Sequence, residues 1–434
     1  MASDELETSC KGETGESAAT ADSKRVLILG GGFGGVYAAL WLEKVLAARD
    51  GLEVTLITRE NYLLFSPMLA EVAADELEQN TIVNPLRKRL RRVKSFVGTI
   101  EEINLDVRHV LVSHGFDGQH ELPYDQLILA LGSGTSFFGL PGVEAACLAL
   151  KTLSDAVAIR NRLITHLEEA NSECAAGQRQ PLLTFIVAGG GFAGVETIGG
   201  INDFVREAIR SYPNLHSGYL RFVLVTPDDV ILPELKRTLG VYARRKLSSR
   251  GVEIVTGAKV RSISDGVVEL TNGEKILATT LIWSAGTAPN ALIAKLPLPK
   301  RNARIVVDPY LGVEGRTGVW AVGDCALVAD PETGGFYPPT AQLALKEGRL
   351  VARNVVAALY GGDKKKFESQ TLGQLAAIGR RSGVANILGL NFSGFLAWWL
   401  WRTIYLASCH GLKRRYVLPW IGRSTCFLRR ISRA

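Results

Sequence analysis

The stretch RVLILGGGFGGVYAALWLEKVLAA, residues 25–48, decides the fold of this chain. An apolar run from Arg25 to Leu29 leads into Gly30-Gly31-Gly32-Phe33-Gly34-Gly35, and a helix-like stretch follows from Val36 to Ala48. This order predicts a dinucleotide-binding unit, because glycines let the backbone approach a pyrophosphate while the helix N-terminus supplies N–H donors. Three glycines can also form an ordinary turn, so the match needs support from elsewhere in the chain.

That support is a second copy of the same order. The apolar run Leu182 to Ala188 leads into Gly189-Gly190-Gly191-Phe192-Ala193-Gly194, and a helix-like stretch follows from Val195 to Ile209. Each unit also closes in the same way, with an apolar strand and a glycine exit, at Gln126 to Thr135 and at Thr280 to Thr287. Two copies predict two bound dinucleotides.

The rest of the central region returns the chain to its first unit. Strand-like runs cover Phe96 to Glu102 and Val107 to Ser113 between the units, and Pro297 to Pro309 is predicted to be a connector. The run Gly318 to Cys325 predicts a final buried strand that ends in a Gly-Asp turn. A helix is predicted from Thr340, its cap, to about Tyr360.

The bulk properties agree with a folded α/β protein of more than one domain. The chain has 434 residues, 47% of them apolar, 45 glycines and a formal net charge of +7. Six cysteines are scattered without a C-x-x-C pair, which argues against a metal or iron–sulfur site and favours a reducing cytosolic setting: Cys10, Cys147, Cys174, Cys325, Cys409 and Cys426. Residues 1–24 match neither a secretory signal nor a transit peptide and are predicted to be a disordered tail.

Both units depart from the usual acid that binds the ribose hydroxyls at the end of the next strand. In the first unit that position is Thr58, with Glu60 two residues further on, and in the second it is Thr226, with Asp228 and Asp229 beyond. Thr226 would not repel the 2′-phosphate of NADPH, whereas the two aspartates can, and no arginine lies nearby in sequence. The pattern favours NADH, and a solvated turn is the alternative.

With these motifs in place, the chain resembles the type II NADH dehydrogenases, the single-subunit, non-proton-pumping NADH:quinone oxidoreductases of the two-dinucleotide-binding-domain flavoproteins. The resemblance covers about Arg25 to the C-terminus. Beyond the two glycine runs, it rests on Asn61 to Pro67, Gly189 to Glu196, Gly323-Asp324, Ala341 to Gly348 and an aromatic, basic C-terminus. It implies hydride transfer from NADH to non-covalently bound FAD, followed by delivery of electrons and protons to a quinone.

The resemblance also implies site residues. The FAD set is Gly30, Gly32, Phe33, Gly34, Gly35, Glu60, Gly323, Asp324 and Ala341. The NADH set is Gly189, Gly191, Phe192, Ala193, Gly194, Glu196, Thr226 and Gly286. The quinone set is Phe65, Pro67, Gln342 and Lys346, and the catalytic residues are Glu196, Gln342 and Lys346, with no metal.

Three of these residues have ordinary alternatives. Asp324 can be a turn former, and Glu196 an exposed helix residue rather than a buried acid that moves protons. Lys346 stands where the family more often has a second glutamine. It shares a helix face with Gln342 and can either donate to a quinone or extend into solvent.

The acceptor follows from an absence of cysteine. Relatives that reduce disulfides carry a cysteine pair beside the flavin, whereas Phe65 to Val72 has none and is apolar, as a quinone site requires. A sulfide:quinone oxidoreductase remains an alternative, with Cys147 and Cys325 as its central candidates. A membrane-bound nucleotide sensor without turnover is another.

The C-terminus is predicted to be a membrane face. No run reaches the ~20 apolar residues of a transmembrane helix. Phe392 to Leu406 is aromatic with one charge, Arg402, and Ser369 to Ala434 contains ten lysines and arginines and no acid. Interfacial amphipathic helices are predicted at Gly394 to Ala407 and Ser424 to Ile431. A dimer interface is the alternative use of these tryptophans.

Together these patterns predict an α/β protein with two Rossmann-like dinucleotide-binding domains and a C-terminal membrane-associating helical region. The predicted segments are a tail (1–24), the FAD domain in two parts (25–148 and 286–345), the NADH domain (149–285) and the membrane-anchoring region (346–434). The predicted partners are a quinone, an anionic membrane surface and a second copy of the chain. Nucleic acid is a poor fit, because the basic residues alternate with bulky aliphatics. The predicted location is peripheral, on the cytoplasmic face of a bacterial inner membrane.

Overall fold

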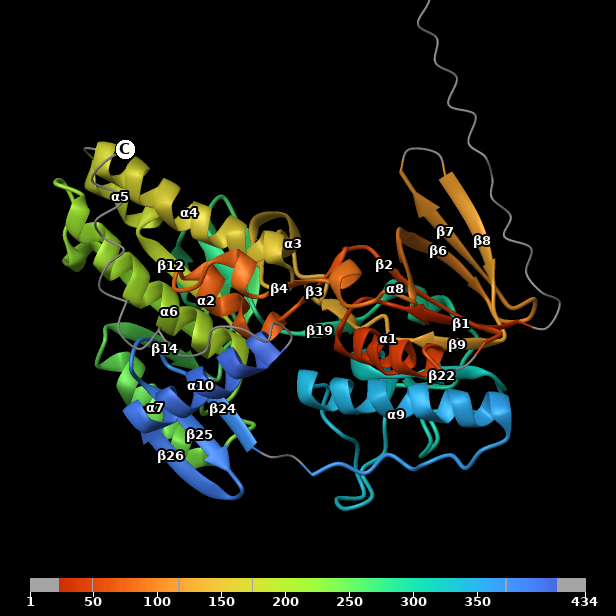
Figure 1. Ribbon diagram of the computed structural model, residues 1–434. Coiled ribbons are helices and arrows are strands. Elements are labelled where there is room, and N and C mark those ends of the chain that lie inside the picture. The colour runs from red at the N-terminus through yellow and green to blue at the C-terminus, as the bar shows by residue number, and fades with distance from the viewer. Residues whose placement is uncertain (1–22, 49, 116–117, 174, 371–372, 412–434) are drawn as a thin grey trace, which may run out of the picture.

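A computed structural model describes residues 23–48, 50–115, 118–173, 175–370 and 373–411. The predicted tail lies outside the described residues except for its last two positions, and Lys24 is already the first residue of a strand. The predicted helix at residues 424–431 also lies outside them. Figure 1 shows two lobes. One lobe contains the first dinucleotide-binding unit, including the strand β22 (Val319–Ala321) that comes late in the chain, and the other lobe contains the second unit.

The first lobe is built on a five-stranded parallel sheet. Its order is β22-β9-β1-β2-β5 (Val319–Ala321, Gln126–Leu129, Lys24–Leu29, Leu52–Thr58 and Lys94–Val97). The strand β22 comes from far along the chain, after the second unit. The prediction that the chain returns to its first unit is therefore confirmed.

The second lobe repeats this sheet. Its parallel order is β11-β18-β12-β13-β14 (Leu148–Ala149, Thr280–Trp283, Thr184–Ala188, Arg221–Thr226 and Val252–Thr256). Each lobe also carries a three-stranded antiparallel sheet. These are β6-β7-β8 (Thr99–Asn104, His109–His114, Gly118–Pro123) and β15-β16-β17 (Val260–Ser264, Val267–Leu270, Lys275–Leu277). The chain is thus an α/β protein with two parallel Rossmann-like sheets.

The helices after the glycine runs begin earlier than predicted. Helix α1 spans Phe33–Leu46 and α6 spans Phe192–Ala208, so the last three residues of each run form the first helical turn. The predicted single strand from Phe96 to Glu102 is wrong, because the chain leaves the parallel sheet at Gly98 and starts β6 at Thr99. The N–H of Gly98 still donates to the carbonyl of Thr58, and a Cβ at Gly98 would lie 2.6 Å from the Ser113 carbonyl oxygen.

The two glycine exits pair with each other. Strands β10 (Ser133–Thr135) and β19 (Thr287–Pro289) form an antiparallel ribbon that joins the lobes. The predicted connector from Pro297 to Pro309 contains two short strands, β20 (Lys300–Arg301) and β21 (Arg304–Val306), which pair with each other, and β21 also pairs with β23 (Ala326–Leu327). Strands β3 (Tyr62–Leu64) and β4 (Val83–Pro85) form a further pair. Three short helices complete these connections: α2 (Leu69–Ala73), α3 (Val143–Ala146) and α8 (Ala291–Lys295).

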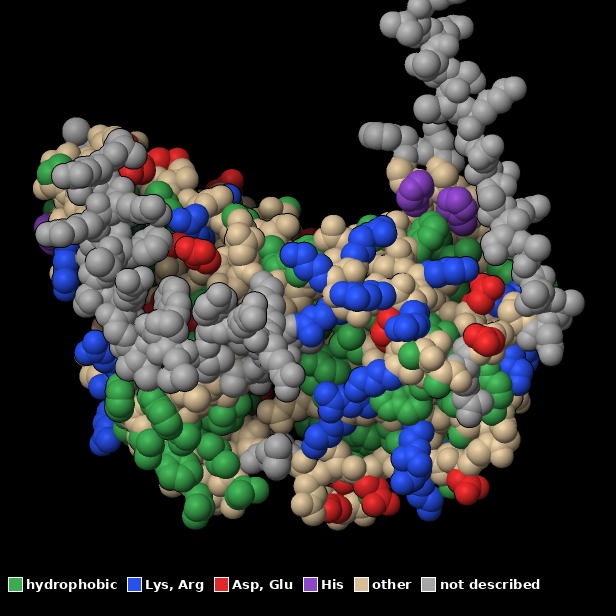
Figure 2. All heavy atoms as spheres, in the orientation of Figure 1, with side chains coloured by type: hydrophobic (Ala, Val, Ile, Leu, Met, Phe, Trp, Pro, Cys, Tyr) green, Lys and Arg blue, Asp and Glu red, His purple; other side chains and the backbone are tan. Residues whose placement is uncertain are grey.

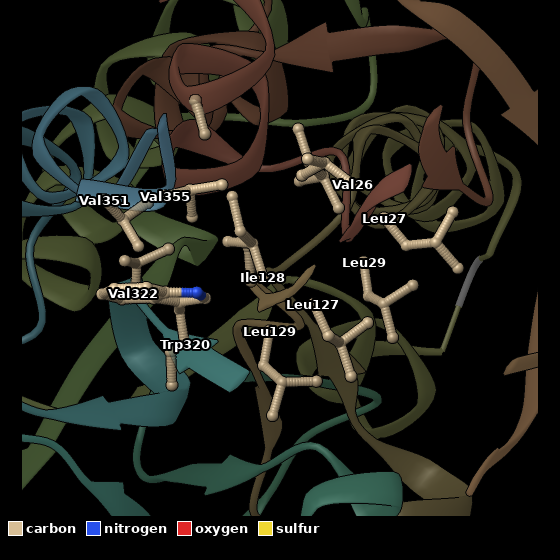
Figure 3. Close-up of a cluster of buried hydrophobic side chains, with 14 of the residues drawn as sticks. Val26, Leu27, Leu29, Leu127, Ile128, Leu129, Trp320, Val322, Val351 and Val355 are labelled. Carbon is tan, nitrogen blue, oxygen red and sulfur yellow. The ribbon is translucent and has the colours of Figure 1, made fainter. Parts of the chain in front are cut away.

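Helix α9 (Ala341–Tyr360), capped by the hydroxyl of Thr340 as predicted, packs on α1 in the first lobe. A Cβ at Gly348 would lie only 2.1 Å from the carbonyl oxygen of Gly34, so the two helices touch backbone to backbone. Figure 3 shows Val351 and Val355 of α9 facing the buried side chains of the first sheet. The helix runs through residues 345 and 346, where the sequence places a domain boundary.

The second lobe holds α4 (Leu153–Ser172), α5 (Ala176–Leu182) and α7 (Arg237–Ser248). The chain then crosses back from α9 to this lobe, where β24, β25 and β26 form a meander (Gly373–Ala377, Gly383–Ile387 and Leu390–Gly394). Helix α10 (Phe395–Gly411) packs on this meander and confirms the first predicted C-terminal helix. Among the described helices, none is long and apolar enough to cross a membrane.

Candidate functional site

Two helix N-termini are prepared to bind anions. The residues before α1 and α6 are Gly32 and Gly191, and neither helix start has a side-chain cap. The first N–H groups of each helix therefore keep the unpaired donors and partial positive charge that attract a phosphate.

The glycines around each turn are required by close packing. Gly30 has φ +116°, and a Cβ there would lie 2.1 Å from the Ala130 carbonyl oxygen. Gly189 has φ +121°, and a Cβ there would lie 2.6 Å from Ser284 Oγ. At Gly32, by contrast, nothing lies within 4 Å of the place that a Cβ would occupy. This open cradle above an uncapped helix fits the pyrophosphate of a dinucleotide.

The threonines at the strand ends have a structural role. Thr58 and Thr226 are buried beneath the second glycine of each turn, and a Cβ at Gly190 would lie 2.5 Å from Thr226 Oγ1. Each hydroxyl accepts a hydrogen bond from a backbone N–H two residues on, that of Glu60 at 3.3 Å or that of Asp228 at 3.4 Å. The two acids are thereby exposed just beyond the strand, which accounts for the shifted acid in both units.

An arginine that the sequence pattern did not reveal lies beside the second strand end. Arg237, the first residue of α7, donates to the carboxylate of Asp229 with an Nη1–Oδ2 distance of 2.5 Å. Helix α7 begins eight residues beyond this aspartate, so sequence proximity did not indicate the pair. Of the two aspartates beyond the strand end, Arg237 therefore pairs with Asp229 and not with Asp228.

A second feature that the sequence did not indicate lies where β2 and β5 end. A cavity of about 280 Å³ opens there, and polar side chains including Arg59 and His114 line it. The carboxyl ends of parallel strands are where nucleotides bind in this class of sheet.

Asp324 belongs to a polar network at the start of α9. It follows β22 in the turn Gly323–Cys325, and its Oδ2 accepts from the Ser133 hydroxyl at 2.7 Å while Lys151 Nζ lies 3.9 Å away. The N–H of Gly323 donates to the buried Glu347 carboxylate at 2.6 Å. Burial raises the pKa of Glu347 to about 7. Ser133, Lys151 and Glu347 are neighbours of the predicted site that the sequence did not identify.

Glu196 lies on the first turns of α6 and accepts a hydrogen bond from the Ala377 N–H of β24 at 3.1 Å. Burial raises the pKa of Glu196 to about 8, and the negative charge of Glu71 acts in the same direction. This environment differs from that of an exposed helix residue. It holds an acid that can be protonated at neutral pH.

Aromatic rings connect the first glycine turn to α10. Phe33 of the turn packs edge-on against Phe65 with 5.7 Å between ring centroids, and Phe65 packs edge-on against Tyr405 at 6.2 Å. Tyr405 in turn stacks on Trp401 at 5.2 Å. Pro67 lines a small cavity that Glu196 and Trp401 also line.

The other predicted acceptor residues lie on α9. Gln342 is exposed in its first turn. Lys346 Nζ donates to the Ser369 hydroxyl at 2.7 Å and to the Gln370 carbonyl at 3.0 Å. The segment that leaves α9 therefore contacts the lysine, and a contact of Lys346 with a quinone stays a prediction.

The central cysteines have no features of a reactive pair. Cys325 is buried and donates to the carbonyls of Leu129 and Val322, and Cys147 is half-buried. Burial raises the pKa of each thiol to about 11, the opposite of a reactive thiolate. Among the described residues, no group of three or more His, Cys, Asp or Glu side chains is placed to bind a metal.

Two Rossmann-like lobes, each with its own glycine turn, define a protein with two dinucleotide-binding domains. Sequence comparison places the chain in the same class. The model of the pyridine nucleotide-disulphide oxidoreductase family matches residues 24–348, and the model of the NDH2 C-terminal domain matches residues 372–423. The chain is 31% identical over 414 residues to the type II NADH:quinone oxidoreductase Ndh of Mycobacterium tuberculosis, covering 91% of this chain and 87% of the relative.

A probable NADH dehydrogenase of Dictyostelium discoideum is 30% identical over 95% of this chain and 91% of its own length. A solved structure of NDH2 from Plasmodium falciparum in complex with NADH shares the fold, with a TM-score of 0.80, 20% identity and coverage of 88% of this chain and 94% of that one. The chain belongs to the type II NADH:quinone oxidoreductase family.

Proposed function

We propose that the protein oxidises NADH through a flavin bound on the first glycine turn and reduces a quinone that reaches the flavin from the α10 side. Oxidation of NADH with reduction of a quinone is the activity of the family to which the chain belongs. The observation that carries the proposed geometry is the row of rings from Phe33 through Phe65 to Tyr405, which connects the first glycine turn to the surface helix.

FAD fits the first unit. The open cradle at Gly32 and the uncapped start of α1 suit its pyrophosphate, and the exposed Glu60 suits the ribose hydroxyls. Asp324, with Gly323 and Ala341, bounds the same side, where Ser133 and Lys151 hold the aspartate in place. The bound group would accept hydride from the nicotinamide and release electrons to the acceptor.

NADH fits the second unit. Its glycine turn, Gly189 to Gly194, presents the uncapped start of α6 to a pyrophosphate, and Gly286 bounds the turn after β18. Asp228 lies two residues beyond Thr226, the position at which Glu60 stands in the first unit. A carboxylate there favours the ribose diol of NADH over the 2′-phosphate of NADPH.

Glu196 is proposed to be the acid beside the nicotinamide and the flavin. Its raised pKa keeps it protonated below about pH 8, so it can donate a proton during acceptor reduction. Phe65 and Pro67 would form the apolar wall of the quinone site. Gln342 and Lys346 would complete it, and Lys346 must leave Ser369 and Gln370 to contact a quinone.

The α10 side is proposed to rest on an anionic membrane. Figure 2 shows hydrophobic side chains gathered on the lower part of the second lobe, where β25 and β26 lie. Large apolar side chains with 44 to 77% of their surface exposed lie on this meander and α10: Leu388, Leu390, Phe395, Leu396 and Trp399. Ten lysines and arginines and no acid between residues 369 and 434 suit a negatively charged leaflet, which favours the cytoplasmic face of a bacterial inner membrane.

A homodimer is part of the proposal as well. Exposed tryptophans such as Trp399 are typical of protein interfaces as well as of membrane surfaces. Light scattering in detergent gives the mass of the particle. Co-sedimentation with anionic and with neutral vesicles tests the membrane surface, and equal binding to both would contradict the electrostatic part of the proposal.

One anaerobic experiment tests donor, cofactor and acceptor together. The purified protein is mixed with NADH and, separately, with NADPH, while flavin absorbance is followed. We expect rapid bleaching by NADH, slower bleaching by NADPH and recovery of colour when a short-chain quinone is added. A purified protein without flavin absorbance, or one whose colour a quinone does not restore, would contradict the proposed function.

A further inference from the structure

A small cavity lies where α2, α6, β24 and α10 meet. Its volume of about 10 Å³ suits roughly one water molecule. Three carboxyl side chains line it, those of Glu71 on α2, Glu76 just beyond α2 and Glu196 on α6. Trp401 of α10 forms part of the wall as well.

Three polar atoms of the residues that line this cavity are buried without a hydrogen bond: Oε2 of Glu71, Oε1 of Glu76 and Nε1 of Trp401. Glu71 has 7% of its surface exposed and Trp401 has 1%. The indole N–H of Trp401 faces the Glu196 carboxylate without full hydrogen-bond geometry. A buried polar atom left unpaired costs about 1–3 kcal/mol, and a water that accepts from the indole and hydrogen-bonds to both Glu71 and Glu196 satisfies Nε1 of Trp401 and Oε2 of Glu71 together. Oε1 of Glu76 lies instead 3.6 Å from Arg380 Nε.

The three acids of the cavity do not each have an arginine of their own. Arg402 of α10 lies 3.3 Å from Glu71 Oε1, and Arg380 Nε lies 3.6 Å from Glu76 Oε1. Arg380 is shared with Glu207 of α6. Glu196 has no arginine among these ion pairs.

The further titratable groups that face the three acids do not supply this charge. Asp203 of α6 acts on Glu76 and is itself paired with Arg250 at 3.1 Å, and Tyr405 of α10 lies near Glu196. Burial raises the pKa of both Glu71 and Glu196 to about 8, and burial also raises the pKa of Glu76. The cluster therefore holds protons at neutral pH.

The reaction requires a proton supply of this kind. A quinone takes up two electrons and two protons to become a quinol. The hydride of NADH brings two electrons and one proton, so the second proton comes from solvent. If Glu196 donates at the reacting side, it must be reprotonated each turnover from a group that is not itself at that side.

We propose that Glu71 reprotonates Glu196 through one water held in this cavity by Trp401, and that Glu76 and Arg380 mark the side from which solvent recharges Glu71. This inference rests on the proposed function and assigns Glu71 a relay role behind Glu196. Arg402 acts as a positioning residue, because its guanidinium donates a hydrogen bond to Oε1 of Glu71 and so leaves Oε2 for the water.

The test is Glu71→Gln, which keeps an acceptor for Arg402 but cannot pass a proton. Two acceptors are compared with the same NADH: a short-chain quinone, which takes protons, and ferricyanide, which takes electrons alone. Quinone reduction is expected to fall by ~10-fold or more, while ferricyanide reduction changes less than about two-fold. Glu78→Gln, an exposed carboxylate on the same segment, is the matched control and is expected to leave both rates unchanged.

The pH profile adds a readout that a structural defect would not change. The wild-type quinone rate is expected to fall as pH rises through about 8, where Glu71 and Glu196 lose their protons. The ratio of wild-type to Glu71→Gln rates is therefore expected to be largest near about pH 6 and to shrink above about pH 8. Trp401→Phe, which keeps the stack on Tyr405 but removes the N–H, is expected to slow quinone reduction in the same way.

Two results overturn the inference. One is a Glu71→Gln enzyme with the wild-type quinone rate and pH profile. The other is an equal loss with ferricyanide and quinone, which would show damage to electron transfer rather than to proton supply. Failure of the proposed function is distinguishable from either, because it would appear in the wild-type protein as absence of NADH-dependent quinone reduction.

Discussion

The two glycine units share a frame and differ in what lies on their helices. Four strands have the same order in both sheets, β9-β1-β2-β5 and β18-β12-β13-β14, and both have a buried threonine at the strand end. The outermost strand differs, because β22 follows its unit in the chain and β11 precedes it. In the first unit α1 is covered by α9. Tyr37 of α1 stands seven positions after Gly30, and its ring lies 5.1 Å from the guanidinium of Arg349 on α9. In the second unit the equivalent position after Gly189 is Glu196, which lies under β24 and beside α10.

Glycines make this difference possible. A Cβ at Gly199 would lie 2.7 Å from the Gly379 N, and one at Gly200 would lie 2.8 Å from the Ala74 Cβ. The corresponding residues of α1 are Leu40 and Trp41, which pack into the first core. The repeated frame is thus the proposed nucleotide site, whereas the elements packed on α6 create the acidic cavity for which we propose a role in proton transfer.

The largest effect is expected from breaking the first turn. Gly30→Ala forces a side chain into φ +116° and against the Ala130 carbonyl, so it should cost at least ~3 kcal/mol of stability and abolish flavin retention. Gly189→Ala should instead keep flavin and lose NADH oxidation. The measurements are flavin absorbance per protein and Tm. Gly51→Ala, with φ +74° and open space around it, is the control that should retain flavin.

Much of this frame follows from the sequence, because its signals are local. The glycine turns, the cap at Thr340 and the aromatic run of α10 each occupy one short stretch, and each forms the predicted element. The predicted ends of the elements were less accurate, because the last residues of each glycine run also adopt the helical conformation of the first turn. The FAD, NADH and quinone assignments of individual residues remain predictions.

The acidic cavity was not predictable, because its parts are far apart in the chain. Arg402 meets Glu71 across a separation of 331 residues, and Ala377 meets Glu196 across 181. One local signal was available: Glu71 lies within an apolar stretch, and a carboxyl group there must find a partner or hold a proton. Lys346 was also beyond prediction, since its partner is the segment that leaves its own helix.

The next largest effect is expected at Glu196 of α6, the position that Tyr37 occupies in α1. Glu196→Gln should lower the NADH:quinone rate by ~100-fold, because the variant cannot donate a proton. The wild-type rate should fall as pH rises through about 8, since the pKa of Glu196 is raised and the acid form is lost above it. Glu196→Gln should lack this decline. Tyr37→Phe is the matched change in the first unit, and a comparable loss there would refute the distinction.

The cradle of the second turn is less open than that of the first. A Cβ at Gly191 would lie 3.1 Å from Oε1 of Glu234, whereas nothing lies near Gly32. Burial raises the pKa of Glu234, and its carboxylate opposes a pyrophosphate when charged. Glu234→Gln should therefore lower the KM for NADH by ~3- to 5-fold with little change in kcat. Titration of flavin bleaching against NADH measures this, and an unchanged KM would mean that the side chain moves away when nucleotide binds.

The smallest effect is expected at the end of β13, where the second unit has Arg237 beside Asp229. An arginine near the ribose can accommodate the 2′-phosphate of NADPH, and here it also neutralises one of the two aspartates that oppose that phosphate. Arg237→Ala should therefore raise the preference for NADH over NADPH by about 3-fold, mainly through a higher KM for NADPH. Asp229→Asn frees the same arginine and should shift the preference the other way. The ratio of kcat/KM values for the two donors in both variants decides the point, since parallel shifts would mean that this pair only fastens α7 to the strand end.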